Sequence, residues 1–283
     1  MSDNIKTMYQ MLLKNIFSLF LTVISLNIVF AQSADEMVFM QKMKLPKGEN
    51  KAQTAITIAK SFIGQPYKAG TLDALPNEQL VCNLRDFDCW TFVESVTAMT
   101  LTKYDEKPSY EKFNNHLKNL RYRKGKVNGY GSRIHYFKEW MIQTEDNNIA
   151  QEMTPLIGGE EANKNINFMT AHRNLYTKLQ DKESFSAVEK AQKTINTYDF
   201  FFIPKSKVSK IESEIKDGDI IGITSGVEGL DFNHEGFAIK QNGRIHLLHA
   251  SYDLKKVMIT TEPLADYLNR IKKHSGITVL RLL

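Results

Sequence analysis

The chain has 283 residues, of which 42% are hydrophobic and 24% charged, and its 15 Gly and 7 Pro exclude a collagen-like or proline-rich disordered chain. Its 2 cysteines exclude a small disulfide-stapled scaffold and a four-cysteine zinc module. A net charge of +5 permits an anionic partner without requiring one.

The first 31 residues are typical of a signal peptide. Lys6 and Lys14 precede an apolar stretch over residues 16–30, and Ala31 supplies a small residue before the expected cleavage site. The alternative is a membrane anchor, but a membrane span needs about 20 apolar residues and this stretch is shorter. We therefore expect a periplasmic or secreted protein without a stable membrane anchor after cleavage.

The first half of the mature chain predicts helices. Residues 32–50 are a polar lead-in. Apolar residues at helical spacing predict one helix over 51–64, a second that begins near Cys89, and a third over 132–143. Residues around 145–195 are polar with helical tendency but still contain apolar positions, which indicates a helical insertion.

The second half predicts strands. Short β-rich runs are separated by Gly, Asp and Asn, and one helix over 262–273 interrupts them. The runs cover 200–203, 220–224, 237–239, 244–248, 257–260 and 278–283. Helices followed by strands indicate the α+β class, with residues 51–283 as a single domain.

Cys89 is the first candidate for chemistry, because it stands directly before a strong helical pattern. A thiol at a helix N-terminus meets the positive end of the macrodipole, and the free N–H groups there can stabilise an oxyanion. Asp86 and Asp88 raise the pKa of the thiol, so a nearby histidine is required. The alternatives are a buried, inert cysteine and a disulfide with Cys82.

Two histidines are candidates for the base and its orienting group. His234 opens one strand and His249 closes the next, and the turn over 241–243 predicts a hairpin that brings the imidazoles together. A zinc site of His234, His246 and His249 is the alternative. However, His246 and His249 face opposite sides of a strand and no HExxH motif occurs, so we expect no metal.

A basic run lies between the second and third predicted helices. It is either a solvated helix end or a surface for an anionic polymer or peptide carboxylates. Its members are Lys118, Arg121, Arg123, Lys124 and Lys126. No nucleic-acid-binding motif and no Walker or Rossmann glycine pattern is present, so we expect no nucleic-acid partner and no cofactor. The sequence does not indicate an oligomeric state.

Three parts of the chain together resemble the NlpC-type papain-like cell-wall hydrolases: residues 59–67, residues 87–94, and the histidine segments 234–238 and 248–251. Two further segments, 130–140 and 229–234, resemble one branch, the N-acetylmuramoyl-L-alanine amidase-like family. The resemblance spans residues 52–283. It implies a papain-like fold in which N-terminal helices pack on an antiparallel sheet or partial barrel, with the helical insertion added.

The resemblance also implies the chemistry. Cys89 is the expected nucleophile, which argues against a Cys82–Cys89 disulfide, His234 is the base, and His249 orients it. One departure is Glu235, where such strands often carry Val; if the strand is amphipathic, its side chain points away from Cys89.

The implied activity is a secreted cysteine amidase that hydrolyses the N-acetylmuramoyl-L-alanine bond of peptidoglycan or its fragments through a muramyl thioester. Alternatives are an endopeptidase that cuts between D-Glu and the diamino acid of the stem peptide, a non-catalytic wall-binding module, and acyl transfer to an amine.

Four residues are candidates for substrate binding. Tyr67 is expected beside the nucleophile, and Arg133 is suited to a bidentate pair with a stem-peptide carboxylate. Ser132 and Asp231 complete the set. Their structural alternatives are a helix N-cap for Ser132 and a turn for Asp231.

Overall fold

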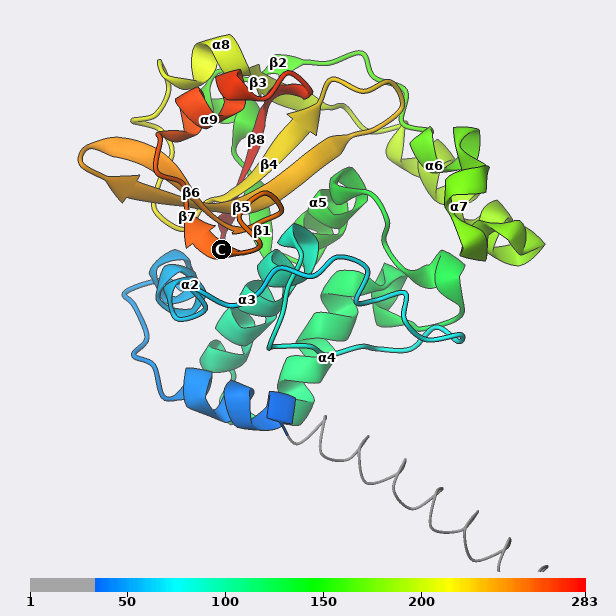
Figure 1. Ribbon diagram of the computed structural model, residues 1–283, viewed down its shortest axis with the longest axis horizontal. Helices are drawn as coiled ribbons and strands as arrows, with labels where there is room; N and C mark the ends of the chain where they lie inside the picture. Colours follow the sequence, from blue (N-terminus) through cyan, green and yellow to red (C-terminus); the bar gives the residue numbers. More distant parts are fainter. Residues whose placement is uncertain (1–33) are drawn as a thin grey trace, which may run out of the picture.

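The computed structural model describes residues 34–283, so the signal peptide expected over 1–31 lies outside the described residues. The described part is a mixed α+β structure in which helices pack on an antiparallel sheet (Figure 1). Within it, no helix has the length and apolar character that a bilayer span requires.

The longer helices lie mainly in the first half of the chain. Residues 34–43 of the expected polar lead-in are helical, and their Phe39 is buried in the core. The other helices are α2 (Lys51–Lys60), α3 (Cys89–Tyr104), α4 (Tyr110–Arg121), α5 (Phe137–Asp146), α6 (Phe168–Ala171), α7 (Lys182–Ile195), α8 (Lys205–Val208) and α9 (Leu264–Arg270).

The strands form one antiparallel sheet in the order β2-β3-β8-β4-β5-β6-β7, and β1 pairs with β8 beside this path. Their bounds are β1 (Ala150–Glu152), β2 (Glu160–Glu161), β3 (Phe201–Pro204), β4 (Ile220–Ser225), β5 (Phe232–Gln241), β6 (Arg244–Ser251), β7 (Lys256–Ile259) and β8 (His274–Leu282). Asn242 and Gly243 turn the β5–β6 hairpin with φ 50° and 81°, which confirms the predicted turn.

The two faces of the sheet are covered by different helices. Helices α2 to α5 lie on one side and α8 and α9 on the other (Figure 1). Phe237 of β5 contacts Phe92 of α3 with ring centroids 5.9 Å apart, whereas Ala238 belongs to the core beneath α9. Because successive side chains of a strand face opposite sides, this fixes the direction of the side chains from His234 to Gln241; the register of β5 shifts before His234, and Phe232 again faces the α3 side.

The local sequence explains why α3 begins at Cys89. The Asp88 side chain accepts a hydrogen bond from the backbone N–H of Thr91, and the Thr91 side chain in turn accepts from the backbone N–H of Asp88. Because of this reciprocal capping box, α3 begins directly after Asp88, and Cys89 lies in its first turn.

Three expectations about the elements need correction. Helix α5 begins at Phe137 rather than 132, because residues 130–132 form a 3-10 turn and Arg133 makes a β-bridge with Tyr122. Helix α4 was not predicted; its few buried apolar residues are diluted by polar ones. The region 145–195, expected to be helical, also contains β1 and β2, whose partners β8 and β3 lie far away in sequence.

Candidate active site

Cys89 lies partly exposed in the first turn of α3. Asp88 caps the N–H of Thr91 and accepts the N–H of Phe92, but within the described residues the N–H groups of Cys89 and Trp90 have no hydrogen-bond partner. Unpaired N–H groups at a helix N-terminus are suited to hold an anionic oxygen. Cys89 therefore places a sulfur beside two N–H groups that could hold an anionic oxygen.

Cys89 meets β5 where that strand has separated from β6. The β5–β6 pairing runs from Gln241↔Arg244 only as far as Phe237↔Leu248, and β6 beyond this point pairs with β7. Next to the separation, Cys89 neighbours Glu235, and the charge of Glu235 raises the pKa of the thiol. The departure of the two strands from each other thus makes room for the thiol.

The expected direction of the Glu235 side chain was therefore wrong. Glu235 shares a face with Phe237, and this is the face covered by α3. Cys89 lies one helical turn before Phe92 on α3, and Glu235 lies two residues before Phe237 on β5. The Cys89–Glu235 pair and the Phe92–Phe237 pair therefore lie next to each other along the interface between α3 and β5.

Burial raises the pKa of both the Cys89 thiol and the Glu235 carboxyl. Burial, followed by the charges of Glu235 and Asp88, raises the pKa of the Cys89 thiol well above its ordinary value. Burial raises the pKa of Glu235 to about 8, and Asp88, Asp231 and Glu94 add to the shift. Both groups therefore favour their neutral forms at pH 7, and a thiolate requires a base that takes the proton.

His234 and His249 form a directly bonded pair. His234 Nε2 lies 2.5 Å from His249 Nδ1, with the ring planes at 84°. This confirms the predicted meeting of the imidazoles and leaves His234 Nδ1 without another hydrogen bond among the described residues. Alternation along β5 places the His234 ring on the face opposite Glu235, and in the described part of the chain neither imidazole is hydrogen-bonded to Cys89. Burial lowers the pKa of His249 to about 4 and that of His234 well below its ordinary value, so both rings are neutral at pH 7 and are weaker bases than a free imidazole.

The neighbouring histidine, His246, faces the other side of β6. Its Nδ1 is 2.8 Å from the Thr260 carbonyl oxygen, which gives it a structural partner away from the bonded pair. In the part of the chain that the structure describes, no three His, Cys, Asp or Glu side chains converge as metal ligands would.

Tyr67 lies in the same neighbourhood as Cys89. It makes a β-bridge with Phe87 just before the Cys89 helix, and its ring packs edge-on against Tyr252 at 5.6 Å. Burial raises the pKa of its hydroxyl, and the nearby Cys89, Asp88 and Glu235 raise it further. Its phenol is therefore a neutral hydrogen-bonding group beside the thiol.

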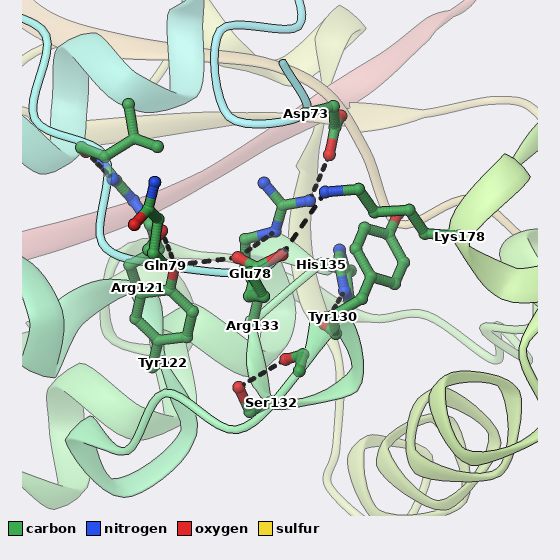
Figure 2. Close-up of polar contacts among 12 residues, drawn as sticks. Asp73, Glu78, Gln79, Arg121, Tyr122, Tyr130, Ser132, Arg133, His135 and Lys178 are labelled. Carbon is green, nitrogen blue, oxygen red and sulfur yellow. Dashed lines mark hydrogen bonds and ion pairs between the residues drawn. The ribbon is translucent and has the colours of Figure 1, made fainter. Parts of the chain in front are cut away.

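Arg133 lies in a second polar cluster, which Figure 2 shows. The buried guanidinium pairs with Asp73, its Nε is 3.5 Å from Glu78, and it lies over the Tyr130 ring at 4.9 Å. Lys178 of the region 145–195 also approaches Glu78, at 3.9 Å. Asp73, Glu78 and Lys178 carry no motif that would have revealed this cluster in the sequence.

Ser132 and Asp231 are engaged with the main chain. Ser132 Oγ donates to the Gly129 carbonyl and accepts from the Asn128 N–H, both at 2.8 Å (the Ser132–Gly129 bond is drawn in Figure 2). Asp231 is buried and accepts from the Lys138 N–H at 3.0 Å, so it caps the first turn of α5, and burial raises its pKa to about 6. Neither the expected N-cap role of Ser132 nor a simple turn role of Asp231 describes these contacts.

Both cysteines are free, so no disulfide joins Cys82 to Cys89. Burial raises the pKa of the Cys82 thiol to about 11. Cys82 is therefore an unreactive neighbour rather than a partner of the site.

Residues 57–277 match a family described as AmiA-like, N-acetylmuramoyl-L-alanine amidase-like, and the chain belongs to this family. A crystal structure of an N-acetylmuramoyl-L-alanine amidase from Bacteroides uniformis is 34% identical, with a TM-score of 0.78 over 82% of this chain and 99% of that one. No curated protein sequence matches the chain.

Two other solved structures are similar. A provisionally named xylanase from Bacteroides fragilis is 34% identical, with a TM-score of 0.75 over 79% of this chain and 98% of that one. A protein from Legionella pneumophila shares the fold at 23% identity, with a TM-score of 0.67 over 89% and 94% of the two chains. Together, the family and the Bacteroides uniformis amidase support a peptidoglycan amidase-like enzyme.

Proposed function

We propose that this protein is a secreted cysteine amidase with an NlpC-type papain-like fold, which hydrolyses the N-acetylmuramoyl-L-alanine bond of peptidoglycan or its fragments. The observation that carries the proposal is the position of Cys89 at the start of α3, which packs on β5, the strand whose His234 is bonded to His249. The proposed reaction requires the His234 ring to turn toward the α3 side of β5, where Cys89 lies. A nucleophile, a base and an orienting group are the parts that covalent acyl transfer requires. Family membership supplies the substrate class.

In the first half of the reaction, His234 takes the thiol proton on Nδ1 and the Cys89 sulfur attacks the lactyl carbonyl carbon. The backbone N–H groups of Cys89 and Trp90 donate to the resulting oxyanion. The imidazolium then protonates the nitrogen of L-alanine, the carbon–nitrogen bond breaks, and a muramyl thioester remains on Cys89.

In the second half, water replaces the released peptide. His234, neutral again, takes a proton from the water as its oxygen attacks the thioester carbonyl, and the sulfur leaves as thiolate and recovers a proton. His249 holds the His234 ring through the bond at 2.5 Å and fixes its tautomer. Because burial lowers the pKa of both imidazoles, His234 is neutral at pH 7 before it takes the thiol proton.

Of the four substrate-binding candidates, Tyr67 and Arg133 have the surroundings that suit the role. Tyr67 borders the thiol, and Arg133 pairs with Asp73, whose side chain is 55% exposed. A stem-peptide carboxylate that displaces Asp73 gains a buried guanidinium and keeps its charge matched. The side chains of Ser132 and Asp231 are already used by the main chain, and we assign them supporting roles.

The test is mass spectrometry of purified peptidoglycan digested by the mature protein, with the Cys89→Ala variant as the control. The proposal predicts intact stem peptides released from the glycan by the wild type only. Stems shortened after D-Glu would establish the endopeptidase instead. No Cys89-dependent product would favour the wall-binding module.

A further inference from the structure

A groove along helix α5 takes no part in the reaction proposed above. It has a volume of about 1130 Å³ and is lined by residues of α4, α5 and α7 together with the segment 123–125. Its α5 residues share one face of that helix, because they occur three, four and seven positions after the first. They are Glu139, Ile142, Gln143 and Asp146. Pockets for small molecules typically have volumes of about 300–1,000 Å³, so the groove is suited to a longer ligand.

One part of the groove adjoins the segment that carries Arg133. Gly131 and Arg123 both line it, and the Arg123 guanidinium donates to the Gly131 carbonyl and pairs with both carboxylate oxygens of Glu139. Helix α7 packs directly on this segment, since a Cβ at Gly131 would lie 2.5 Å from the Ala187 Cβ. Gly131 stands two residues before Arg133. The groove is therefore joined through the backbone to the guanidinium that we assign to a stem-peptide carboxylate.

The charged side chains that line the groove are not all paired. Arg123 and Glu139 neutralise each other, but Lys124 and Lys190 are exposed, and neither forms an ion pair within residues 34–283. Asp146 is unpaired within the same residues. Two free ammonium groups and one free carboxylate complement a ligand with more carboxylates than amines. A peptide stem that contains D-Glu and a diamino acid is such a ligand.

The backbone holds Lys124, a member of the basic run of the sequence, in a fixed conformation. Its φ is 54°, in the left-handed region that is costly for a lysine. Gln143 secures this turn. Its side-chain oxygen accepts the Lys124 N–H at 3.0 Å, and its side-chain nitrogen donates to the carbonyl oxygens of Asn119 at 2.6 Å and Tyr122 at 3.0 Å. A strained residue that is held by its surroundings is typical of a binding site.

We propose that this groove is a second substrate-binding site, which holds one carboxylate-bearing peptide stem of polymeric peptidoglycan while another stem is cleaved at Cys89. The inference rests on the proposed function, which supplies the polymer. Lys124 and Lys190 pair with carboxylates of the held stem, and Asp146 pairs with its amine. Because both stems belong to one polymer, the groove raises the effective concentration of the bond to be cut. It thereby favours the intact wall over fragments with a single stem.

The test is a pelleting assay with purified peptidoglycan sacculi, in which every protein carries Cys89→Ala so that nothing is cleaved. Lys124→Asn/Lys190→Gln, the groove variant, removes both charges, and asparagine tolerates the left-handed backbone. The matched control, Lys182→Gln/Lys240→Gln, removes two exposed charges outside the groove lining. At low salt we expect the apparent Kd for sacculi to rise about fivefold in the groove variant only. This difference should vanish for sacculi whose carboxylates have been amidated.

An unchanged Kd in the groove variant, an equal rise in the control, or a difference that persists on amidated sacculi would overturn the proposal. With Cys89 intact, the ratio of kcat/KM on sacculi to kcat/KM on a single-stem muropeptide should fall about fivefold in the groove variant. An equal fall on both substrates would place the groove inside the cleavage site and overturn its role as a second site.

This result is separable from the proposed function, because the pelleting assay does not depend on which bond is cut. If binding follows the expected pattern but the digest yields stems shortened after D-Glu, the bond assignment fails and the role of the groove stands. If the digest yields intact stems but the groove variant binds sacculi normally, only the role of the groove fails.

Discussion

The polar cluster around Cys89 and the polar cluster around Arg133 differ in how their charges are arranged. Around the partly exposed Cys89, the Glu235 carboxyl and the two imidazoles are buried, all four groups favour their neutral forms, and none has an ion-pair partner within residues 34–283. Around Arg133, the carboxylates of Asp73 and Glu78 balance the guanidinium. The first arrangement keeps protons available for transfer, and the second holds charges in fixed positions, which suits recognition rather than chemistry.

The largest expected effect comes from the histidines of the first cluster. His234→Ala should lower kcat/KM on a defined muropeptide by about 10²–10⁴-fold, the usual contribution of a general base. His249→Ala should cost less, because the base itself remains. His246→Ala is the matched control on the same strand, facing the other side. An equal loss in His246→Ala would mean that strand packing, and not the bonded pair, determines the rate.

A second test uses the pH dependence of stability. Glu235 has its pKa raised from 4.5 to about 8, so its stabilising contribution is complete below 4.5 and is lost as pH rises through 8. The histidines have lowered pKa values, so their contribution is lost only as pH falls below 6.5. Between pH 6.5 and 8 the wild type should therefore lose about 1–2 kcal/mol in its free energy of unfolding.

Urea titrations at pH 6.5, 7.2 and 8 measure how steeply the free energy of unfolding falls with pH, and Glu235→Gln should reduce this slope. Glu152 is the matched control, because its pKa is raised to about 7 and Glu152→Gln should flatten only the lower part of the window. A slope that survives in Glu235→Gln above pH 7.2 would show that the carboxyl is already ionised there.

The Arg133 cluster should respond differently. Arg133→Lys keeps the charge but loses the planar fork, so KM for a muropeptide with a free stem carboxylate should rise about tenfold with little change in kcat. A muropeptide whose carboxylates are amidated serves as the control substrate and should show no such difference. A matching fall in kcat for both substrates would place Arg133 in the reaction itself.

The smallest expected effect concerns Asp231. Because it caps α5, Asp231→Ala should cost about 1 kcal/mol of unfolding free energy and leave KM nearly unchanged. Urea denaturation and steady-state kinetics on the same preparation check both parts. A raised KM with unchanged stability would return Asp231 to the substrate-binding set.

The proposed catalytic residues could be found from the sequence because each has a local pattern. Cys89 precedes a helical repeat, and His234 and His249 flank a hairpin turn that sets their register. The direction of Glu235 was not accessible in this way. Alternation along a strand defines two faces, but only the packing of Phe237 on Phe92 decides which face meets α3.

Contacts between segments that are far apart in the sequence could not be predicted either. Helix α5 is capped by Asp231, 93 positions further along the chain from Lys138, so no local cap could mark its start. Strand β1 exists because it pairs with the C-terminal β8. The Arg133 cluster likewise joins residues from three separate segments that carry no shared motif.

The central claim is that Cys89 carries the muramyl group during the reaction. The most direct measurement is the intact mass of the protein, quenched in acid during turnover of a defined muropeptide, followed by peptide mapping. The account predicts an adduct on Cys89 with the mass of the muramyl moiety and no amino acid. An adduct that contains L-Ala and D-Glu, or unchanged turnover by Cys89→Ala, would contradict it.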